Sequence, residues 1–145
     1  MNVMLDDGAK MPTRAHEEDA GYDLYSRETK LVTAKGNAKF DTGVHIALPF
    51  YEVNRSRKLR TVGFIKSKSG LNVKHDLTTD GVIDMGYTGS IAVKLYNNGN
   101  TDYLVKKGDK IAQLVILPCI TMPLVETDRL DETERGNNGF GSTGY

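Results

Sequence analysis

The chain has 145 residues, which suits one domain with one modest hydrophobic core. Its 19 lysine and arginine residues balance 19 aspartate and glutamate residues, so the formal net charge is zero. This balance argues against a surface for a nucleic acid polymer or an acidic membrane. The single cysteine, Cys119, excludes an intrachain disulfide, and we expect it to be a packed or interface thiol.

No stretch reaches the ~18 apolar residues that a membrane-spanning helix needs. Residues 1–10 lack the apolar region of a signal peptide, so we expect a cytoplasmic protein that does not insert into membranes. Fifteen glycines divide the sequence into short runs, which is typical of an all-β fold with many turns. The three histidines are scattered and form no cluster with zinc-ligand spacing.

The first informative segment runs from Ala20 to Ser26 and has the composition of a strand. It carries Asp23, whose carboxylate either positions a hydrated Mg²⁺ ion or pairs with a cation. The run from Val44 to Leu48 is a second expected strand, which Pro49 ends.

Residues 54–60 carry four cationic side chains. A solvated hairpin tip explains this segment better than a basic contact surface, although a surface for an unknown protein partner stays open.

Lys68, Ser69 and Gly70 open the one candidate helix, which runs through Leu71 to His75, with Ser69 as its cap. The free N–H groups of a helix start, together with a hydroxyl and an ammonium group, suit a phosphate. An ordinary Ser-Gly turn is the alternative.

The segment from Gly81 to Gly89 predicts a strand, a tight turn and a second strand. Asp84 follows two β-branched residues, so its carboxylate is expected to point into a partly enclosed site and to take a proton from water. Tyr87 is placed to pack against a flat sugar face. The alternative is an aspartate that only stabilises the turn.

Three further strands are expected downstream. Ile91, Val93 and Leu95 alternate with polar or small residues and therefore share one face. Residues 103–105 and 111–117 are the other two. Gln113 is a polar residue in the last of these apolar runs, so its amide needs a hydrogen-bonding partner.

The segment from Arg135 to Tyr145 is rich in glycine and too poor in apolar residues to fold alone. Glycines let backbone N–H groups approach phosphate oxygens, and Arg135 is a bidentate cation. Ser142 and Thr143 donate hydrogen bonds, and Phe140 is an aromatic suited to stacking on a base. The segment is either a nucleotide clamp or a disordered tail.

Five of these segments, in this order, resemble the five motifs of the trimeric dUTP pyrophosphatase (dUTPase) family, and residues 41–49 are also similar. The resemblance covers nearly the whole chain. It implies a distorted jelly-roll or β-barrel over residues 1–134 and a C-terminal arm, residues 135–145. It also implies a homotrimer whose active sites lie between subunits. The five segments are Ala20–Ser26, Lys68–Leu71, Gly81–Gly89, Gly108–Val115 and Arg135–Gly144.

The resemblance implies hydrolysis of dUTP to dUMP and pyrophosphate with Mg²⁺. Asp84 would activate the water that attacks the α-phosphorus, Tyr87 would lie under the deoxyribose, and Asp23 would reach the metal through water. The backbone of Gly81, Val82, Ile83 and Ala92 would read uracil. The α- and β-phosphates would be held by Lys68, Ser69, Gly70 and Gln113. The γ-phosphate and the stacked base would be held by Arg135, Phe140, Gly141, Ser142 and Thr143.

One departure from the family pattern is Lys68, which stands where arginine is usual and lacks the planar fork of a guanidinium. Two alternatives to dUTP hydrolysis remain. A dCTP deaminase relative would need a glutamate where this chain has Lys94. A nucleotide-sensing or protein-binding module would not need Asp84 as a general base.

Overall fold

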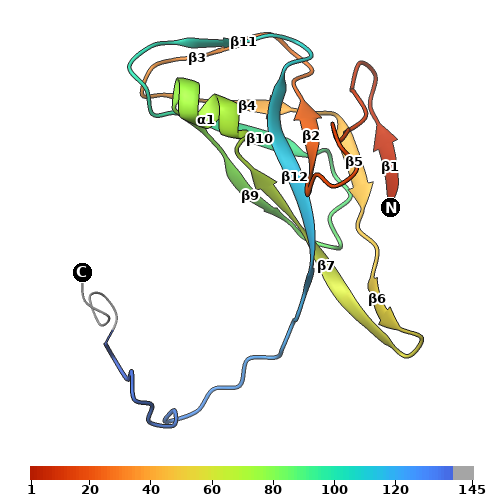
Figure 1. Ribbon diagram of the computed structural model, residues 1–145, viewed down its shortest axis with the longest axis vertical. Coiled ribbons are helices and arrows are strands. Elements are labelled where there is room, and N and C mark those ends of the chain that lie inside the picture. The colour runs from red at the N-terminus through yellow and green to blue at the C-terminus, as the bar shows by residue number, and fades with distance from the viewer. Residues whose placement is uncertain (139–145) are drawn as a thin grey trace.

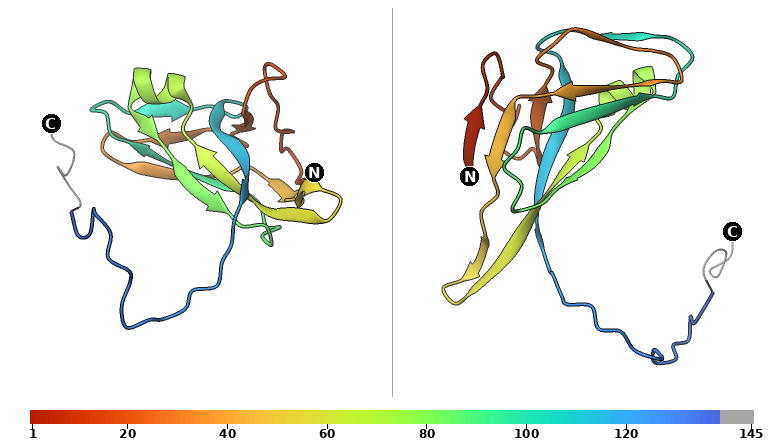
Figure 2. Two further views of the ribbon diagram at one scale, coloured as in Figure 1. Left: turned by 60° about the horizontal axis from the view of Figure 1, so that its bottom comes forward. Right: turned by 180° about the vertical axis from the view of Figure 1, so that it is seen from behind.

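Short antiparallel strands and one helix make up the computed structural model, which describes residues 1–138 (Figures 1 and 2). This confirms the all-β prediction. No helix in this part of the chain has the length and apolar character to cross a membrane. The elements are β1 (Asn2–Leu5), β2 (Gly21–Tyr25), β3 (Lys30–Val32), β4 (Asn37–Asp41), β5 (Val44–Ala47), β6 (Tyr51–Asn54), β7 (Arg57–Lys66), α1 (Ser69–His75), β8 (Leu77–Thr78), β9 (Asp80–Ile83), β10 (Ala92–Asn97), β11 (Tyr103–Val105) and β12 (Lys110–Cys119).

The strands form a distorted jelly-roll. The largest sheet has the order β2-β12-β7-β6, with β9 paired to β7. A second sheet has the order β4-β10-β8, and the pairs β1-β5 and β11-β3 complete the body (Figure 1). The strands of residues 1–138 form four separate sheets. The jelly-roll prediction is confirmed, but no single sheet closes into a barrel in this part of the chain.

The alternation in β10 shows why this sequence forms a strand here. Ile91, Val93 and Leu95 are at most 1% exposed, whereas the residues between them face outward. A period of two places every second side chain on the same face, and apolar burial on that face stabilises the strand. The prediction for these three residues is confirmed.

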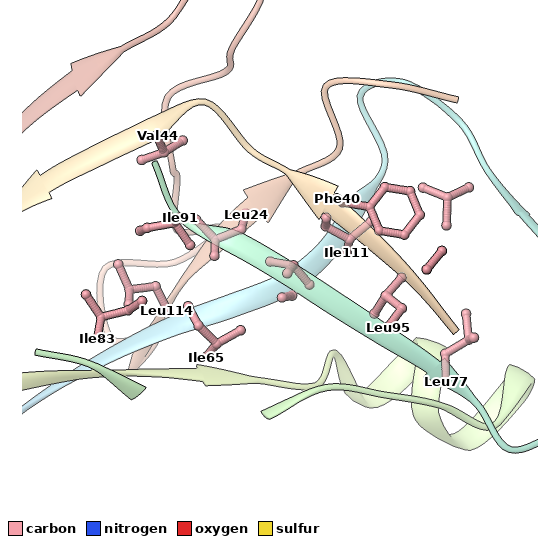
Figure 3. Packing of buried hydrophobic residues seen from close by; sticks show 14 of the residues in the cluster. Leu24, Phe40, Val44, Ile65, Leu77, Ile83, Ile91, Leu95, Ile111 and Leu114 are labelled. Atoms are coloured by element: carbon pink, nitrogen blue, oxygen red, sulfur yellow. The ribbon is translucent and has the colours of Figure 1, made fainter. Parts of the chain in front are cut away.

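The core lies between β10 and the β2-β12-β7 sheet (Figure 3). Ile91 and Leu95 meet Leu114 from β12 and Ile65 from β7 in one cluster. Gly63 in β7 permits this close approach, because a Cβ atom there would lie 3.0 Å from Cδ1 of Leu114. The residues of the cluster are Leu24, Val32, Ala38, Phe40, Val44, Ile46, Leu48, Ile65, Leu77, Ile83, Ile91, Val93, Leu95, Val105, Ile111, Ala112 and Leu114.

Strand β12 extends the predicted run 111–117 by one residue before it and two after it. It pairs with β2 along residues 110–115 and with β7 along residues 113–119. Pro118 lies beyond the end of the β2 pairing, where β12 has only one neighbouring strand. A proline is tolerated at such an edge because its missing N–H is not needed there.

Two segments project from the body in Figure 1. The hairpin of β6 and β7 carries the basic residues 54–60 at its tip, and these side chains are largely exposed, which confirms the predicted solvated hairpin. After Cys119 the chain leaves the sheets, and residues 120–138 are all exposed and contain no strand or helix.

The predicted helix is present, but its cap is not Ser69. Lys68 is the N-cap residue, with extended backbone angles, and no side chain caps the helix. The carbonyl of Lys68 already accepts the N–H of Asn72 at 2.9 Å, which makes Ser69 the first helical residue. A serine inside the first turn no longer has the extended conformation that a capping residue needs.

We expect Leu114→Ala to lower the free energy of unfolding by about 2–5 kcal/mol, because it opens a cavity in the centre of the core. Urea denaturation at fixed protein concentration measures this change. Leu104→Ala is the matched control, since Leu104 is 51% exposed, and a cost of about 1 kcal/mol or less is expected there. Equal effects of the two substitutions would contradict the assigned core.

Candidate active site

The connection between β9 and β10, called the hairpin below, carries the predicted general base and the predicted sugar-packing tyrosine. The two strands are not paired with each other: β9 pairs with β7, and β10 pairs with β4 and β8. The predicted second strand therefore begins only at Ala92 and lies in another sheet. The chain turns directly after β9, where the N–H of Tyr87 donates to the carbonyl of Asp84 at 2.9 Å. The Tyr87 hydroxyl donates to the carbonyl of Ser90 at 2.9 Å, which folds the ring back over the turn. Gly89 makes room for this ring, because a Cβ atom there would lie 2.6 Å from the tyrosine oxygen.

A small cavity of about 250 Å³ lies in this hairpin and is lined only by predicted site residues. They come from β9, from the turn and from the first residue of β10, so the turn brings the ends of two strands of different sheets to one cavity. The Asp84 carboxylate is exposed at its rim rather than enclosed. The lining residues are Val82, Ile83, Asp84, Tyr87 and Ala92.

A larger cavity of about 770 Å³ also reaches Asp84. Its wall includes Phe64 from β7, Val82 from β9 and Cys119 at the end of β12. Val82 and Asp84 line both cavities, so the end of β9 separates them. Cys119 is half-buried in this wall and is a free thiol.

Charged groups hold the second half of the hairpin. Ser90 donates its hydroxyl to the carboxylate of Asp41, which also pairs with the Arg27 guanidinium. The hydrogen bond from Ser90 lowers the pKa of Asp41; burial opposes this effect and the Arg27 charge adds to it. Asp41 is therefore an anion at neutral pH, and it ties the hairpin to β4.

A second group of predicted residues gathers around Asp23 in β2. Its side chain is 7% exposed, and its carboxylate accepts from the ammonium groups of both Lys68 and Lys110, the latter at 2.7 Å. Ser69 and Gly70 follow Lys68 at the start of α1 and are exposed. Lys68 therefore links the phosphate-binding candidates of α1 to the metal-binding candidate of β2.

The two lysines determine the charge of Asp23. Burial alone would raise the pKa of this carboxyl, but hydrogen bonds and charge from Lys110 and Lys68 outweigh it, so the pKa lies below the ordinary 3.8. The carboxylate raises the pKa of Lys110 in return. One buried anion between two cations gives these three side chains a net positive charge, which suits an anionic ligand.

Gln113 satisfies its amide within the chain. Its Nε2 donates to the backbone carbonyl of Ser67 at 3.1 Å. Ser67 in turn accepts the N–H of Thr79 at 2.8 Å and donates to the carbonyl of Thr79 at 3.0 Å. Ser67 thus joins β12 to the segment before β9, and sequence reasoning gave no signal for it.

Sequence reasoning also missed Lys110 as a partner of Asp23, and the register of the sheet explains why. A period of two would place Lys110 and Gln113 on opposite faces of β12. A bulge between Lys110 and Ala112 shifts the register against β2. The side chain of Lys110 therefore reaches Asp23, which pairs with Gln113 in the same sheet.

The hairpin and the Asp23 group lie apart within one chain. In the β7-β9 pairing, Gly63 is opposite Ile83 and Lys66 is opposite Asp80. Asp84 follows one end of this pairing and Lys68 follows the other. At about 3.3 Å per residue, the paired segment alone separates them by about 10 Å.

Of the C-terminal candidates, Arg135 is the one that lies within the described residues. Arg135 lies on the exposed segment that leaves the body after β12, and its Nε donates to the carbonyl of Asn138 at 3.1 Å. Phe140, Gly141, Ser142 and Thr143 lie outside the described residues.

Within residues 1–138, no three histidine, cysteine, aspartate or glutamate side chains are arranged to hold a metal ion. Asp23 is the one predicted metal-binding carboxylate, and both of its oxygens accept from lysines. With both oxygens occupied, Asp23 is not placed to contact a metal ion directly, and only an ion that keeps its waters and is bound mainly by the ligand, as Mg²⁺ often is, fits beside it.

Comparison with known proteins places this geometry in a family. The family model described as dUTPase matches residues 7–144. The Clostridium tetani deoxyuridine 5'-triphosphate nucleotidohydrolase is 41% identical over 141 residues, covering 97% of this chain and 93% of that protein. The Arabidopsis thaliana protein of the same name is 43% identical over 141 residues, covering 97% of this chain and 80% of that protein.

Solved structures show the same similarity. A variant dUTPase of Staphylococcus bacteriophage 80alpha, with dUpNHpp, superimposes with a TM-score of 0.85 at 30% identity and covers 99% of this chain and 98% of its own. A variant dUTPase from phage phi11 of S. aureus, described with a structural Mg(II) ion, has a TM-score of 0.75 at 29% identity, covering 88% of this chain and 96% of its own.

We expect Asp23→Asn to lower the melting temperature at neutral pH, with a gap that closes in acid. A carboxylate whose pKa is depressed by folding contributes stability above its unfolded pKa of 3.8 and loses it as the pH falls through the folded value. Melting curves from about pH 7 to about pH 3 test this. Asp131→Asn, at an exposed position, should match the wild type throughout. A gap that persists unchanged in acid would contradict the proposed ion pairs.

Proposed function

Because the chain belongs to the dUTPase family, we propose that this dUTP diphosphatase works by an attack of water on the α-phosphorus, with Asp84 as the general base. The single observation that carries this assignment is the hairpin cavity. It has Asp84 at its rim, Tyr87 beside it and only predicted site residues in its lining. A carboxylate that is exposed at the edge of a substrate cavity is accessible both to water and to a phosphate.

Uracil is proposed to bind in the hairpin cavity. Val82 and Ile83 belong to β9 and Ala92 opens β10, so backbone groups from both sides of the hairpin lie next to the cavity. Together with Gly81 they offer the N–H and C=O groups that pair with a pyrimidine edge. The Tyr87 ring packs against the deoxyribose, and its anchored hydroxyl limits the room for a 2′-hydroxyl. Selectivity of this kind comes from shape.

The triphosphate is proposed to bind at the Asp23 group. It carries about four negative charges, which must be offset before a nucleophile approaches. Lys68 supplies a cation, Ser69 and Gly70 supply the hydroxyl and N–H groups at the helix start, and Gln113 supplies an amide. Lys68 lacks the bidentate fork of arginine, so it contributes charge with less geometric control, and we expect activity to be retained.

Mg²⁺ is the divalent metal that we propose, bound to the substrate phosphates and reached by Asp23 through a water molecule. When bound, it offsets phosphate charge and orients the triphosphate. Asp23 stays ionised at neutral pH because its two lysines depress its pKa, so it remains an acceptor for a water hydrogen. Lys68 occupies one of its oxygens and has to turn to the phosphate before that oxygen accepts the water.

A homotrimer with shared active sites would join the two groups. Asp84 and Lys68 lie at opposite ends of the β7-β9 pairing, so the hairpin of one subunit and the Asp23 group of another would together form one site. The exposed segment after β12 supports this assembly, because an extended chain with large apolar side chains needs a surface to cover it. Those side chains are Ile120, Met122, Leu124, Val125 and Leu130.

The C-terminal arm, residues 135–145, is proposed to close over a site formed by the other two subunits. Arg135, Gly141, Ser142 and Thr143 would bind the γ-phosphate, and Phe140 would stack on uracil. Closure excludes bulk water and aligns the nucleophile with the phosphorus. A cytoplasmic location remains a prediction, and we do not extend the proposal to a protein partner for the basic residues 54–60.

We expect Asp84→Asn to lower the kcat of pyrophosphate release from dUTP by about 10²- to 10⁴-fold, because an amide does not accept the proton of the attacking water. Binding of dUTP, measured by calorimetry, should change little. Wild-type turnover in the variant would remove Asp84 as the base.

The control is Asp80→Asn, which changes an exposed aspartate of β9 that pairs with Lys66 and should keep wild-type turnover.

Assays of the wild type with dUTP, dTTP, dCTP and UTP test the substrate assignment. Pyrophosphate release is expected from dUTP above the others, and release of ammonia from dCTP would instead support the deaminase alternative.

We expect removal of residues 135–145 to lower kcat/KM by about a hundredfold or more, because the arm aligns the substrate with the nucleophile. The body should keep its far-ultraviolet circular dichroism and melting temperature, since every core residue precedes Cys119. Sedimentation velocity on the full chain tests the trimer separately. Full activity of the truncated protein would exclude the arm from the mechanism.

A further inference from the structure

His45 in β5 connects the substrate hairpin to the N-terminal strand pair. Its Nδ1 lies 2.9 Å from the carbonyl oxygen of Thr88, the residue that follows Tyr87. Its Nε2 lies 3.1 Å from Oδ1 of Asp6, just beyond β1. The side chain is 19% exposed. Among the described residues, His45 is the only side chain that contacts both the Asp6 carboxylate and the Thr88 carbonyl.

The chemistry of the two partners determines the protonation state that suits this geometry. A backbone carbonyl and a carboxylate only accept hydrogen bonds. A neutral imidazole donates from one nitrogen and presents a lone pair at the other, so it satisfies one partner and repels the second. An imidazolium donates from both nitrogens. The contacts of His45 therefore fit the charged form.

The charged groups around the ring act in the same direction. Asp6 faces it from the β1 side, and Asp41 from β4 adds a second negative charge. Arg27 pairs with both aspartates and offsets part of that charge. The hydrogen bond to Thr88 is the largest cause of a raised His45 pKa; burial opposes it, and Asp6 and Asp41 reinforce it.

We infer that His45, as an imidazolium, is a positioning residue that holds the Thr88 carbonyl and so keeps the Tyr87 turn in the geometry that binds dUTP. The inference rests on the proposed role of the hairpin as the nucleoside site. Loss of a proton from His45 leaves the stronger acceptor, the Asp6 carboxylate, with its hydrogen bond. The lone pair of Nδ1 then faces the Thr88 oxygen and releases the turn.

The direction of the pH effect follows from the raised pKa. A histidine whose folded pKa exceeds its ordinary 6.5 makes its full contribution below that value and loses it as the pH rises through the folded pKa. Substrate affinity should therefore decline on the alkaline side. The chemical step does not touch His45, so the effect belongs to KM rather than to kcat.

The test compares wild type and His45→Gln in dUTP hydrolysis from about pH 6 to about pH 9. We expect the KM of the variant to exceed that of the wild type by about two- to tenfold in acid, the range that one hydrogen bond supports. The ratio should approach one in alkali, while the kcat values agree. A constant ratio, or a ratio of one at every pH, would overturn the inference.

Two further variants serve as controls. His16→Gln changes an exposed histidine and should reproduce the wild-type KM at every pH. Asp6→Asn removes the carboxylate beside His45, so the alkaline rise of KM should begin at lower pH. If Asp6→Asn leaves the midpoint in place, the assigned pairing is wrong.

Proton NMR of the full chain tests the same point without catalysis. The Cε1 proton of His45, assigned with His16→Gln and His75→Gln, should titrate above the ordinary histidine pKa of 6.5. A non-hydrolysable dUTP analogue should raise its midpoint further, because coupling between two binding events is reciprocal. A midpoint at or below 6.5 would overturn the inference. Failure of dUTP hydrolysis would instead count against the proposed function and leave this titration interpretable.

Discussion

The antiparallel pairing of β7 with β9 is the constraint on which the site depends. It places the hairpin with Asp84 at one end of a rigid ladder and the start of α1 with Lys68 at the other. Neither group can approach the other without breaking backbone hydrogen bonds in the largest sheet. This separation is one of the observations that support the proposed assembly, in which the two groups of one site come from different subunits.

The Asp23 group shows how one buried anion organises two cations. A buried carboxylate is stable only when it is paired, and here Lys68 and Lys110 both pair with Asp23. The arrangement holds Lys68 beside the start of α1 before any ligand arrives, and in the proposed mechanism Lys68 leaves Asp23 to bind a phosphate. The carboxylate oxygen that it leaves would then accept a water of the metal shell.

Much of the fold could be predicted because it depends on local patterns. The alternation of Ile91, Val93 and Leu95 predicted the core face of β10. The segment 81–89 predicted β9 and the turn after it, but the second strand starts only at Ala92 and Asp84 is exposed rather than partly enclosed. The contacts that hold the site were not predictable in this way. His45 meets Thr88 across 43 residues, and the bulge in β12 that brings Lys110 to Asp23 has no local signature. Ser69 was wrongly predicted as the cap, because the helix begins one residue earlier than the preference for a capping serine suggested, with Lys68 as the N-cap.

Gly89 and the ring of Tyr87 form an epistatic pair. The backbone at Gly89 is not among the left-handed glycines of the described chain, so conformation alone would admit alanine there. The phenol ring prevents it, because its oxygen lies 2.6 Å from the position of an added methyl group and is held by the Ser90 carbonyl. A side chain at position 89 would therefore displace the Tyr87 ring and break its hydrogen bond to Ser90, a cost that disappears in a background without the ring, so natural drift at the two positions is expected to be correlated.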